Sequence, residues 1–516
     1  MTRRSLLATT AGAMASGLVS PGSVLAALGA PPRPVLEERW LGRLTPSGAT
    51  IELTRIADLA GVEWRAPAVA GLELRFRDGA GRWSRWVSGA GHGHGPDAAP
   101  VTGRLIGDPV WTGGSTAVQL RPTRTLTGVR LHLVDVSGGA GARKQALALG
   151  PLALAAALPL ATPSLPAGAG QPPIVARRAW AQGSSHPRVV PGYGTVRMAF
   201  VHHTENPNGY GAGEVPAMLR AIYAFHRYVN GWNDIGYNFV VDSYGRIFEA
   251  RAGGIDEPVV GAHAGGYNLA STGIAVLGSF MSTPITSRAR RALEQLLAWK
   301  LSLHGLPSEG RVTVRVNPAG AVYSRFPANA RVSLPRVAGH RDGDSTDCPG
   351  NVLYGELPEI RARVRRLASR PVRVTLALVE SAAPGPQAPP GAPGGESASE
   401  VPTLTGSLAF LDGGVGGTPV AGAPVMLQAR IVSRKGEAVD ERTIAEAVTN
   451  AEGRWSLPVR ISPEGVLVSL RALCPGAKGI PAAVSDPLHL PGTPVFSPPP
   501  ALAPGPTPPA ASPPAP

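Results

Sequence analysis

Residues 339–350 read GHRDGDSTDCPG, a run of acids and turn-forming residues that ends in a proline and a glycine. It contains one of only two cysteines in the 516 residues, eight positions after His340. Two interpretations of Cys348 are open. In an oxidising compartment it could pair with Cys474, or as a thiolate it could bind a metal ion together with His340. The second interpretation makes this loop the chemical centre of the protein.

The loop lies in a region, residues 172–370, where strand and helix patterns alternate. VRMAFVHHT (196–204) is a short apolar strand, and SRARRALEQLLAWKLSLHG (287–305) has leucines at helical spacing and ends at a glycine. YNFVVDSYGRIFEAR (237–251) indicates two strands joined by a tight turn. These patterns predict a mixed α/β domain. Residues 310–335 exceed what a compact core needs and predict an extra hairpin beside the loop.

The spacing of His340 and Cys348 suits a metal site. A catalytic zinc site takes three protein ligands and keeps a fourth position open. Both residues can face one ion from the loop, and His202, near the end of a strand, can supply the third ligand. The neighbouring His203 cannot, because adjacent residues of a strand point to opposite faces of the sheet.

Four segments of the region resemble, in the same order, the peptidoglycan recognition protein and type 2 N-acetylmuramoyl-L-alanine amidase family. They are FVHHTE (200–205), GWNDIGYNFVVDSYGRIFEAR (231–251), VGAHAGGYNLASTGIAVLG (260–278) and the loop at 339–350. The resemblance covers residues 172–370 and implies a T7 lysozyme-like zinc amidase domain, a mixed sheet flanked by helices. The flanking regions look, more loosely, like those of actinobacterial secreted relatives.

The resemblance also implies roles for individual residues. His202, His340 and Cys348 stand at the positions of the family's zinc ligands, so Zn²⁺ is the expected cofactor. The implied catalytic residues are Tyr237 and Thr346, and the implied substrate-binding residues are His263, Tyr267, Asn268 and Arg251.

Several of these residues have a purely structural alternative. Tyr237 alternates with apolar residues and could belong to the core. His263 could be a strand-end histidine, and Thr346 could hydrogen-bond its own loop. Their joint occurrence in one ordered pattern favours the functional interpretation. Arg251 is followed by Ala-Gly-Gly where eukaryotic recognition proteins have Gly-Trp, so their stem-peptide specificity does not carry over.

The expected function is that of a zinc-dependent hydrolase, an N-acetylmuramoyl-L-alanine amidase. Such an enzyme cuts the amide bond between N-acetylmuramic acid and L-alanine in peptidoglycan. Zinc would activate water and polarise the carbonyl, and the hydroxyls of Tyr237 and Thr346 could donate to the oxyanion. The alternative is a non-catalytic protein that binds peptidoglycan.

The region before the α/β domain has a different pattern. Residues 35–160 contain short alternating runs such as GLELRFRD and GVRLHLVDV, which predict antiparallel strands and a β-sandwich. His92 and His94 could suggest metal binding, but two solvated histidines in a turn are the simpler interpretation. The uncharged stretch from Ala146 is interrupted by prolines, which favours a linker or a packed strand over a membrane span.

The region after the α/β domain divides into three predicted parts. Residues 383–401 form a linker rich in proline and glycine. Residues 402–490 alternate again and predict an immunoglobulin-like β domain. Residues 491–516 are a proline-rich tail, expected to be disordered. The predicted fold class is therefore multidomain, with a central α/β domain between two all-β sandwich-like domains.

The first residues carry a targeting pattern. Residues 1–30 contain Arg3 and Arg4, a weakly apolar stretch, and small residues at Val24 and Ala26 that suit a cleavage site. This is typical of a twin-arginine export signal. A membrane helix is the alternative, but the stretch is rich in small residues and broken by a proline. We therefore expect a secreted or cell-wall protein without a transmembrane span in the mature chain.

The formal net charge of +14 favours a polyanionic partner. Peptidoglycan and other anionic wall polymers fit an exported protein. Nucleic acid is not expected, since the chain has no basic motif interleaved with aromatic residues.

Overall fold

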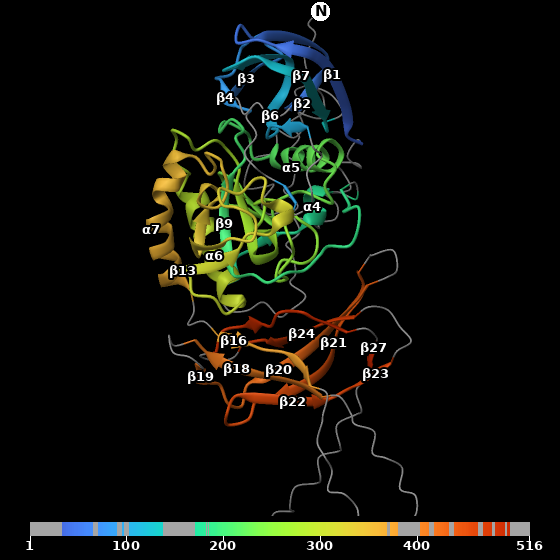
Figure 1. Cartoon of the computed structure of the whole chain (residues 1–516), viewed down its shortest axis with the longest axis vertical. Helices are drawn as coiled ribbons and strands as arrows, with labels where there is room; N and C mark the ends of the chain where they lie inside the picture. The colour runs from blue at the N-terminus through green and yellow to red at the C-terminus, as the bar shows by residue number, and fades with distance from the viewer. Residues whose placement is uncertain are drawn as a thin grey trace, which may run out of the picture.

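The computed structural model arranges the chain as three bodies in sequence order along its long axis (Figure 1). It describes residues 33–65, 71–89, 95–96, 103–137, 171–181, 183, 185–368, 372–379, 403–411, 417–432, 438–462, 468–476, 480–490 and 493–495. The predictions of an export signal, of the turn with His92 and His94, of a linker or packed strand from Ala146 to 170 and of the linker at 383–401 lie outside these residues, as does most of the tail. Among the described residues, no helix is long and apolar enough to cross a membrane.

The N-terminal body is a seven-stranded antiparallel sheet. Its strands are β1 (Val35–Leu44), β2 (Ala49–Arg65), β3 (Leu72–Arg77), β4 (Val87–Ser88), β5 (Arg104–Ile106), β6 (Val110–Pro122) and β7 (Leu126–Asp135). The strand order is β1-β7-β2-β6-β3-β4, with β5 paired to β2. Register shifts between β2 and β6 allow the sheet to bend around its own apolar core. The prediction of antiparallel strands is confirmed. The described strands form one continuous sheet, whereas a sandwich would have two.

The central body contains a mixed six-stranded sheet in the order β15-β9-β12-β10-β11-β8. The strands are β8 (Ile174–Val175), β9 (Met198–His203), β10 (Phe239–Val241), β11 (Ile247–Glu249), β12 (Ser271–Val276) and β15 (Val337–Gly339). All neighbours are parallel except β10 and β11, which form the hairpin expected from the sequence. The strands β9, β10 and β12 are buried throughout, as expected for parallel strands covered on both faces.

Helices cover both faces of this sheet. One face packs against α6 (Ser287–Leu303) and α7 (Asn351–Leu367). The other packs against α4 (Arg177–Ala181), α5 (Val215–Ala224) and η1 (Phe225–Val229), which extends α5. The predicted α/β architecture of the central domain is confirmed, and the short helices η2 (Asn268–Ala270), η3 (Pro318–Gly320) and η4 (His340–Asp342) lie in its connecting loops.

The predicted extra hairpin is present. It consists of β13 (Arg311–Arg315) and β14 (Arg331–Pro335), paired antiparallel. Their inward residues share an apolar cluster with Phe200 of β9 and with Tyr267. The hairpin therefore supports the strand that carries the first predicted metal ligand.

The C-terminal body is built from two larger β-sheets around one apolar core. The first contains β16 (Val372–Val374), β17 (Ala377–Val379), β18 (Thr403–Phe410), β19 (Thr418–Pro419) and β22 (Arg454–Pro458). The second contains β20 (Pro424–Val432), β21 (Ala438–Val448), β24 (Val468–Cys474), β25 (Ala483–Val484) and β26 (Leu488–Leu490). A further pair is β23 (Arg460–Ser462) with β27 (Thr493–Val495). Because β16 and β17 pair with β18, this body begins before the predicted linker and not at residue 402.

Both flanking bodies pack against the central one. Leu59, Trp111 and Val134 of the N-terminal sheet join the apolar cluster around α5. Leu473 and Val484 of the C-terminal body join the cluster around α6. The central domain is thus held between the two β bodies (Figure 1).

Candidate metal centre

Three chain segments bring His202, His340 and Cys348 to one point. His202 lies near the carboxyl end of β9, and His340 begins η4 directly after β15, which pairs in parallel with β9. The carboxyl ends of parallel neighbours meet at the same edge of a sheet, so the two histidines are adjacent. The loop after η4 then returns Cys348 to them. The ligand atoms of the three residues lie within 4.8 Å of one another, and all three residues are buried.

The donor set fits zinc. Two imidazole nitrogens and one thiolate are typical zinc ligands, and three of them leave one tetrahedral position open. Metal–ligand bonds of about 2.0–2.3 Å put tetrahedral ligands roughly 3.5 Å apart. Cys348 Sγ lies 3.7 Å from His202 Nδ1. Burial raises the pKa of the Cys348 thiol well above its usual value, so a bound cation would be needed to hold it as a thiolate at neutral pH.

The alternative interpretation of Cys348 as half of a disulfide is wrong. Both cysteines are free and buried. Cys474 ends β24 and packs in the core of the C-terminal body, whereas Cys348 lies beside the two histidines of the central domain.

Two further side chains fix the orientation of the histidines. Asp344 Oδ2 lies 2.8 Å from His340 Nε2, and His263 Nδ1 lies 3.1 Å from His202 Nε2. Partners of this kind orient metal-binding imidazoles. Sequence reasoning missed Asp344, although it lies only four residues after His340. It assigned His263 to the substrate groove, whereas the structure places this residue fully buried behind His202.

His203 takes the opposite face of β9, as predicted. Its Nε2 lies 2.9 Å from Glu205 Oε1, and its ring faces Phe280. The main-chain N–H of His203 nevertheless points toward the candidate metal centre, where it donates a hydrogen bond to Cys348 Sγ over 3.4 Å. This hydrogen bond favours the thiolate form of the cysteine.

Tyr237 lies directly beside the cluster. Its ring centroid is 5.5 Å from that of His202, and only 4% of the residue is exposed. Burial raises the pKa of its hydroxyl well above the usual value, and the negative charges of Asp108, Cys348 and Glu205 add to the shift. The hydroxyl therefore keeps its proton at neutral pH and can act as a hydrogen-bond donor.

Thr346 lies in the loop between the two loop ligands and is half-buried. Its Oγ1 accepts a hydrogen bond of 3.0 Å from the main-chain N–H of Cys348. Thr346 therefore does form the hydrogen bond within its own loop that the structural interpretation predicts. A hydroxyl that accepts one bond can still donate its own proton, so this contact does not conflict with a catalytic role.

The other residues predicted to bind substrate are tied into the protein. The hydroxyl of Tyr267 shares a hydrogen bond of 2.8 Å with Ser324 Oγ. It also lies within hydrogen-bond distance of the main-chain oxygen of Gly343, in the metal loop. Arg251 donates to Ile235 O, and burial lowers its pKa. Asn268 accepts from the main-chain N–H groups of residues 263 and 264 through Oδ1. All three side chains shape the site from within and do not line an open surface in this conformation.

The N-terminal body also reaches the site. Asn268 Nδ2 donates to the main-chain oxygen of Gly95 over 2.9 Å. Gly95 lies against the ring of Tyr323, where a Cβ would come within 2.6 Å of a ring carbon. Asp108, from the same body, acts on the pKa values of both Tyr237 and Cys348. Sequence reasoning missed these contacts because they join segments with no common motif.

Comparison with known proteins identifies the family. A family model described as N-acetylmuramoyl-L-alanine amidase matches residues 192–351, which include His202, His340 and Cys348. Peptidoglycan-recognition protein SC2 of Drosophila melanogaster is 31% identical over 162 residues, which make up 31% of this chain and 72% of that protein. This chain belongs to the peptidoglycan recognition protein and type 2 amidase family.

Other similar proteins are named either as amidases or as recognition proteins. The human N-acetylmuramoyl-L-alanine amidase is 30% identical over 178 residues, but these make up 34% of this chain and only 26% of that protein. The crystal structure of peptidoglycan recognition protein-LE in complex with tracheal cytotoxin is 28% identical, with a TM-score of 0.28, and the match covers 36% of this chain and 92% of that one.

A second family model concerns the N-terminal body. It is described as the Rv3811 N-terminal galactose-binding domain-like family and matches residues 45–148. The match agrees with the antiparallel β structure found from β2 to β7. Together the two models show an amidase-family domain preceded by a galactose-binding-like domain.

Proposed function

We propose that this protein is a zinc-dependent N-acetylmuramoyl-L-alanine amidase that hydrolyses the bond between N-acetylmuramic acid and L-alanine in peptidoglycan. The observation that carries the proposal is the convergence of the ligand atoms of His202, His340 and Cys348 within 4.8 Å, with the ring of Tyr237 5.5 Å from that of His202. The family supports an amidase in general terms.

Three residues would hold the metal, and others would act on the substrate. Zinc, when bound, supplies a Lewis acid and lowers the pKa of water toward neutrality. Tyr237 keeps its proton and would donate a hydrogen bond to the oxygen of the scissile amide as negative charge develops there. Thr346, half-buried in the same loop, would be a second donor. The buried surroundings of the cluster exclude bulk water and strengthen these interactions.

A non-catalytic peptidoglycan-binding protein is the second candidate. The observations that favour it are the similarity to peptidoglycan-recognition protein SC2 and the galactose-binding-like family that the N-terminal body matches.

One experiment separates the two candidates. Purified protein is incubated with peptidoglycan and zinc at several pH values, and released stem peptides are measured by mass spectrometry. An amidase releases free stem peptides, and its Cys348→Ser variant does not, whereas Cys474→Ser behaves like the parent. A binder releases none, yet sediments equally well with the wall in parent and Cys348→Ser forms. Absence of released peptides from the zinc-loaded parent would rule out the first candidate.

We further propose that the protein acts outside the cytoplasmic membrane, at the cell wall. The support is the twin-arginine pattern of residues 1–30 and the positive net charge of +14. Fractionation of cells that express the full chain, with Arg3 and Arg4 intact or both replaced by lysine, tests this location. Export that survives the double replacement would contradict a twin-arginine route.

A further inference from the structure

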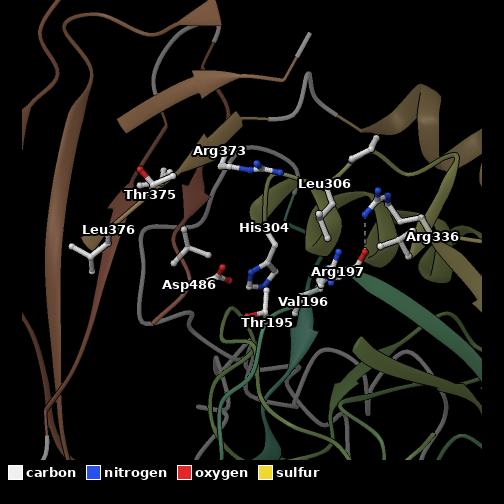
Figure 2. Close-up of a pocket in the computed structure, with 14 residues that line it drawn as sticks. Thr195, Val196, Arg197, His304, Leu306, Arg336, Arg373, Thr375, Leu376 and Asp486 are labelled. Carbon is white, nitrogen blue, oxygen red and sulfur yellow. Dashed lines mark hydrogen bonds between the residues drawn. The ribbon is translucent and has the colours of Figure 1, made fainter. Parts of the chain in front are cut away.

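A cavity of about 530 Å³ lies between the central domain and the C-terminal body, away from the metal centre. Figure 2 shows the side chains that line it, drawn from both bodies. The central domain contributes Arg197, His304 and Arg336, and the C-terminal body contributes Arg373 and Asp486. We call this the interdomain cavity. It contains none of the residues assigned to the amidase reaction.

Buried ion pairs hold the two walls of the cavity together. Arg471 of β24 lies 3.3 Å from Asp256 and 2.5 Å from Glu257, both in the central domain. Within the central domain, Lys300 of α6 holds this acidic segment by donating to the main-chain oxygens of Ile255 and Glu257, each over 2.8 Å. All four charged side chains are at least nine-tenths buried. Breaking such contacts leaves charges unpaired, so the interface and the cavity that it encloses are fixed features of the fold.

The interdomain cavity is positively charged. Three arginines face one carboxylate, which leaves two positive charges in excess. The groups lie close enough to affect each other: burial and the charges of Arg197 and Arg373 lower the pKa of Arg336. Partial burial raises the pKa of Asp486, and the charges of Arg373 and Arg197 oppose that shift. An anion inside the cavity would relieve the repulsion among the arginines.

Two buried side-chain nitrogens of the residues that line the cavity have no hydrogen-bond partner in the described part of the chain. Arg336 Nη1 donates to Arg197 O over 2.7 Å, but its buried Nε has no partner among the described residues. The buried Nε2 of His304 likewise has none there. Burial lowers the pKa of His304 well below its usual value, so the imidazole is neutral. A neutral imidazole has one nitrogen that donates and one that accepts, and Nε2 is the nitrogen without a partner among the described residues, so it is the one free to receive a hydroxyl proton.

We propose that the interdomain cavity binds a phosphorylated saccharide. The phosphate oxygens would accept hydrogen bonds from Arg336 and Arg373, since planar guanidinium groups match phosphate geometry. A sugar hydroxyl would donate to His304 Nε2, which gives the unsatisfied acceptor its partner. The apolar face of the sugar ring would lie on Leu306, which also lines the cavity. The volume is in the range of known small-ligand sites.

Equilibrium dialysis of the full-length protein against labelled glucose 1-phosphate tests the proposal, with glucose, inorganic phosphate and acetate in parallel. We expect glucose 1-phosphate to bind at one site per chain and inorganic phosphate at least about tenfold more weakly, because it lacks the ring contacts. Glucose and acetate should not bind at the same concentrations. No binding of glucose 1-phosphate, or equal binding of acetate, overturns the proposal. Equal affinity for inorganic phosphate overturns the saccharide part.

Two substitutions in the cavity should change the affinity for glucose 1-phosphate in opposite directions. Arg373→Gln should weaken binding of glucose 1-phosphate at least about tenfold, since it removes a charge-assisted hydrogen bond. Asp486→Asn should strengthen it about threefold, since it removes a repelling charge. A general loss of structure would weaken binding in both variants and could not produce this opposition. Arg454→Gln, at an exposed residue of β22 in the same body, is the matched control and should leave binding unchanged. Equal effects of Arg373→Gln and Asp486→Asn would overturn the assignment.

Discussion

His340 Nε2 lies 2.8 Å from a carboxylate oxygen of Asp344, and neither residue has any solvent exposure. Since this contact occupies Nε2, Nδ1 is the nitrogen that His340 can offer to a metal shared with His202 and Cys348. The loop therefore supplies both a metal ligand and, four residues later, the group that orients it.

Asp344→Asn should weaken zinc binding by about 10- to 100-fold, because an amide orients the imidazole less firmly and does not raise its basicity. Competition with a chromogenic chelator measures the zinc affinity. Asp347→Asn is the matched control, since this aspartate is exposed in the same loop. Equal zinc affinity of Asp344→Asn and the parent would show that the contact has no influence on the metal.

Tyr237→Phe should lower the turnover of peptidoglycan by about 10²–10³-fold and leave the zinc content unchanged, because it removes one donor to the developing oxyanion and no ligand. Release of stem peptides and metal analysis of the same samples provide the two readouts. The control is Tyr228→Phe, which changes a half-exposed tyrosine on η1. Parallel loss of zinc in Tyr237→Phe would mean that the tyrosine has a structural role instead.

The stability of the folded protein should depend on pH through Lys300. Burial lowers the pKa of this lysine to about 7, although the charges of Asp256 and Glu257 oppose the shift. An unfolded lysine titrates near about 10.4, so between these values the unfolded chain binds more protons than the folded one. The free energy of unfolding should therefore rise with pH in this window, by at most about 1.4 kcal/mol per pH unit.

Urea unfolding at a series of pH values from about 7 to about 10 checks this expectation. The comparison is with Lys300→Met, which keeps the length of the side chain and has no titrating group. The parent should gain stability relative to the variant as the pH rises. Identical slopes for the two proteins would show that Lys300 does not titrate in this range.

The contact between the N-terminal body and η1 depends on a glycine. A Cβ at Gly61 of β2 would come within 2.3 Å of the ring of Phe225. Gly61→Val should thus destabilise the protein by about 1–3 kcal/mol, because valine suits a strand but cannot fit against this ring. Urea unfolding measures the loss. Gly79→Ala, where a Cβ would meet no atom within 4 Å, should be close to neutral.

Local sequence patterns were sufficient to predict the α/β architecture of the central domain. The alternation of buried strands with amphipathic helices predicts β9, α6 and the β10–β11 hairpin, because burial imposes a fixed period on each kind of element. The boundary of the C-terminal body was not predictable in the same way. Strands β16 and β17 are separated from their partner β18 by the predicted linker, and pairing across such a gap leaves no local trace.

The sequence by itself determined the α/β domain and the three residues His202, His340 and Cys348, because strand periodicity and loop spacing are local properties. Only the tertiary structure decided what surrounds them. It placed His263 behind His202, brought Asp108 and Gly95 to the site from another body, and gathered Arg197, Arg336 and Arg373 around one cavity. In the sequence these arginines are dispersed charges. They face one another because the packing of whole bodies, which no short stretch encodes, sets which distant side chains meet.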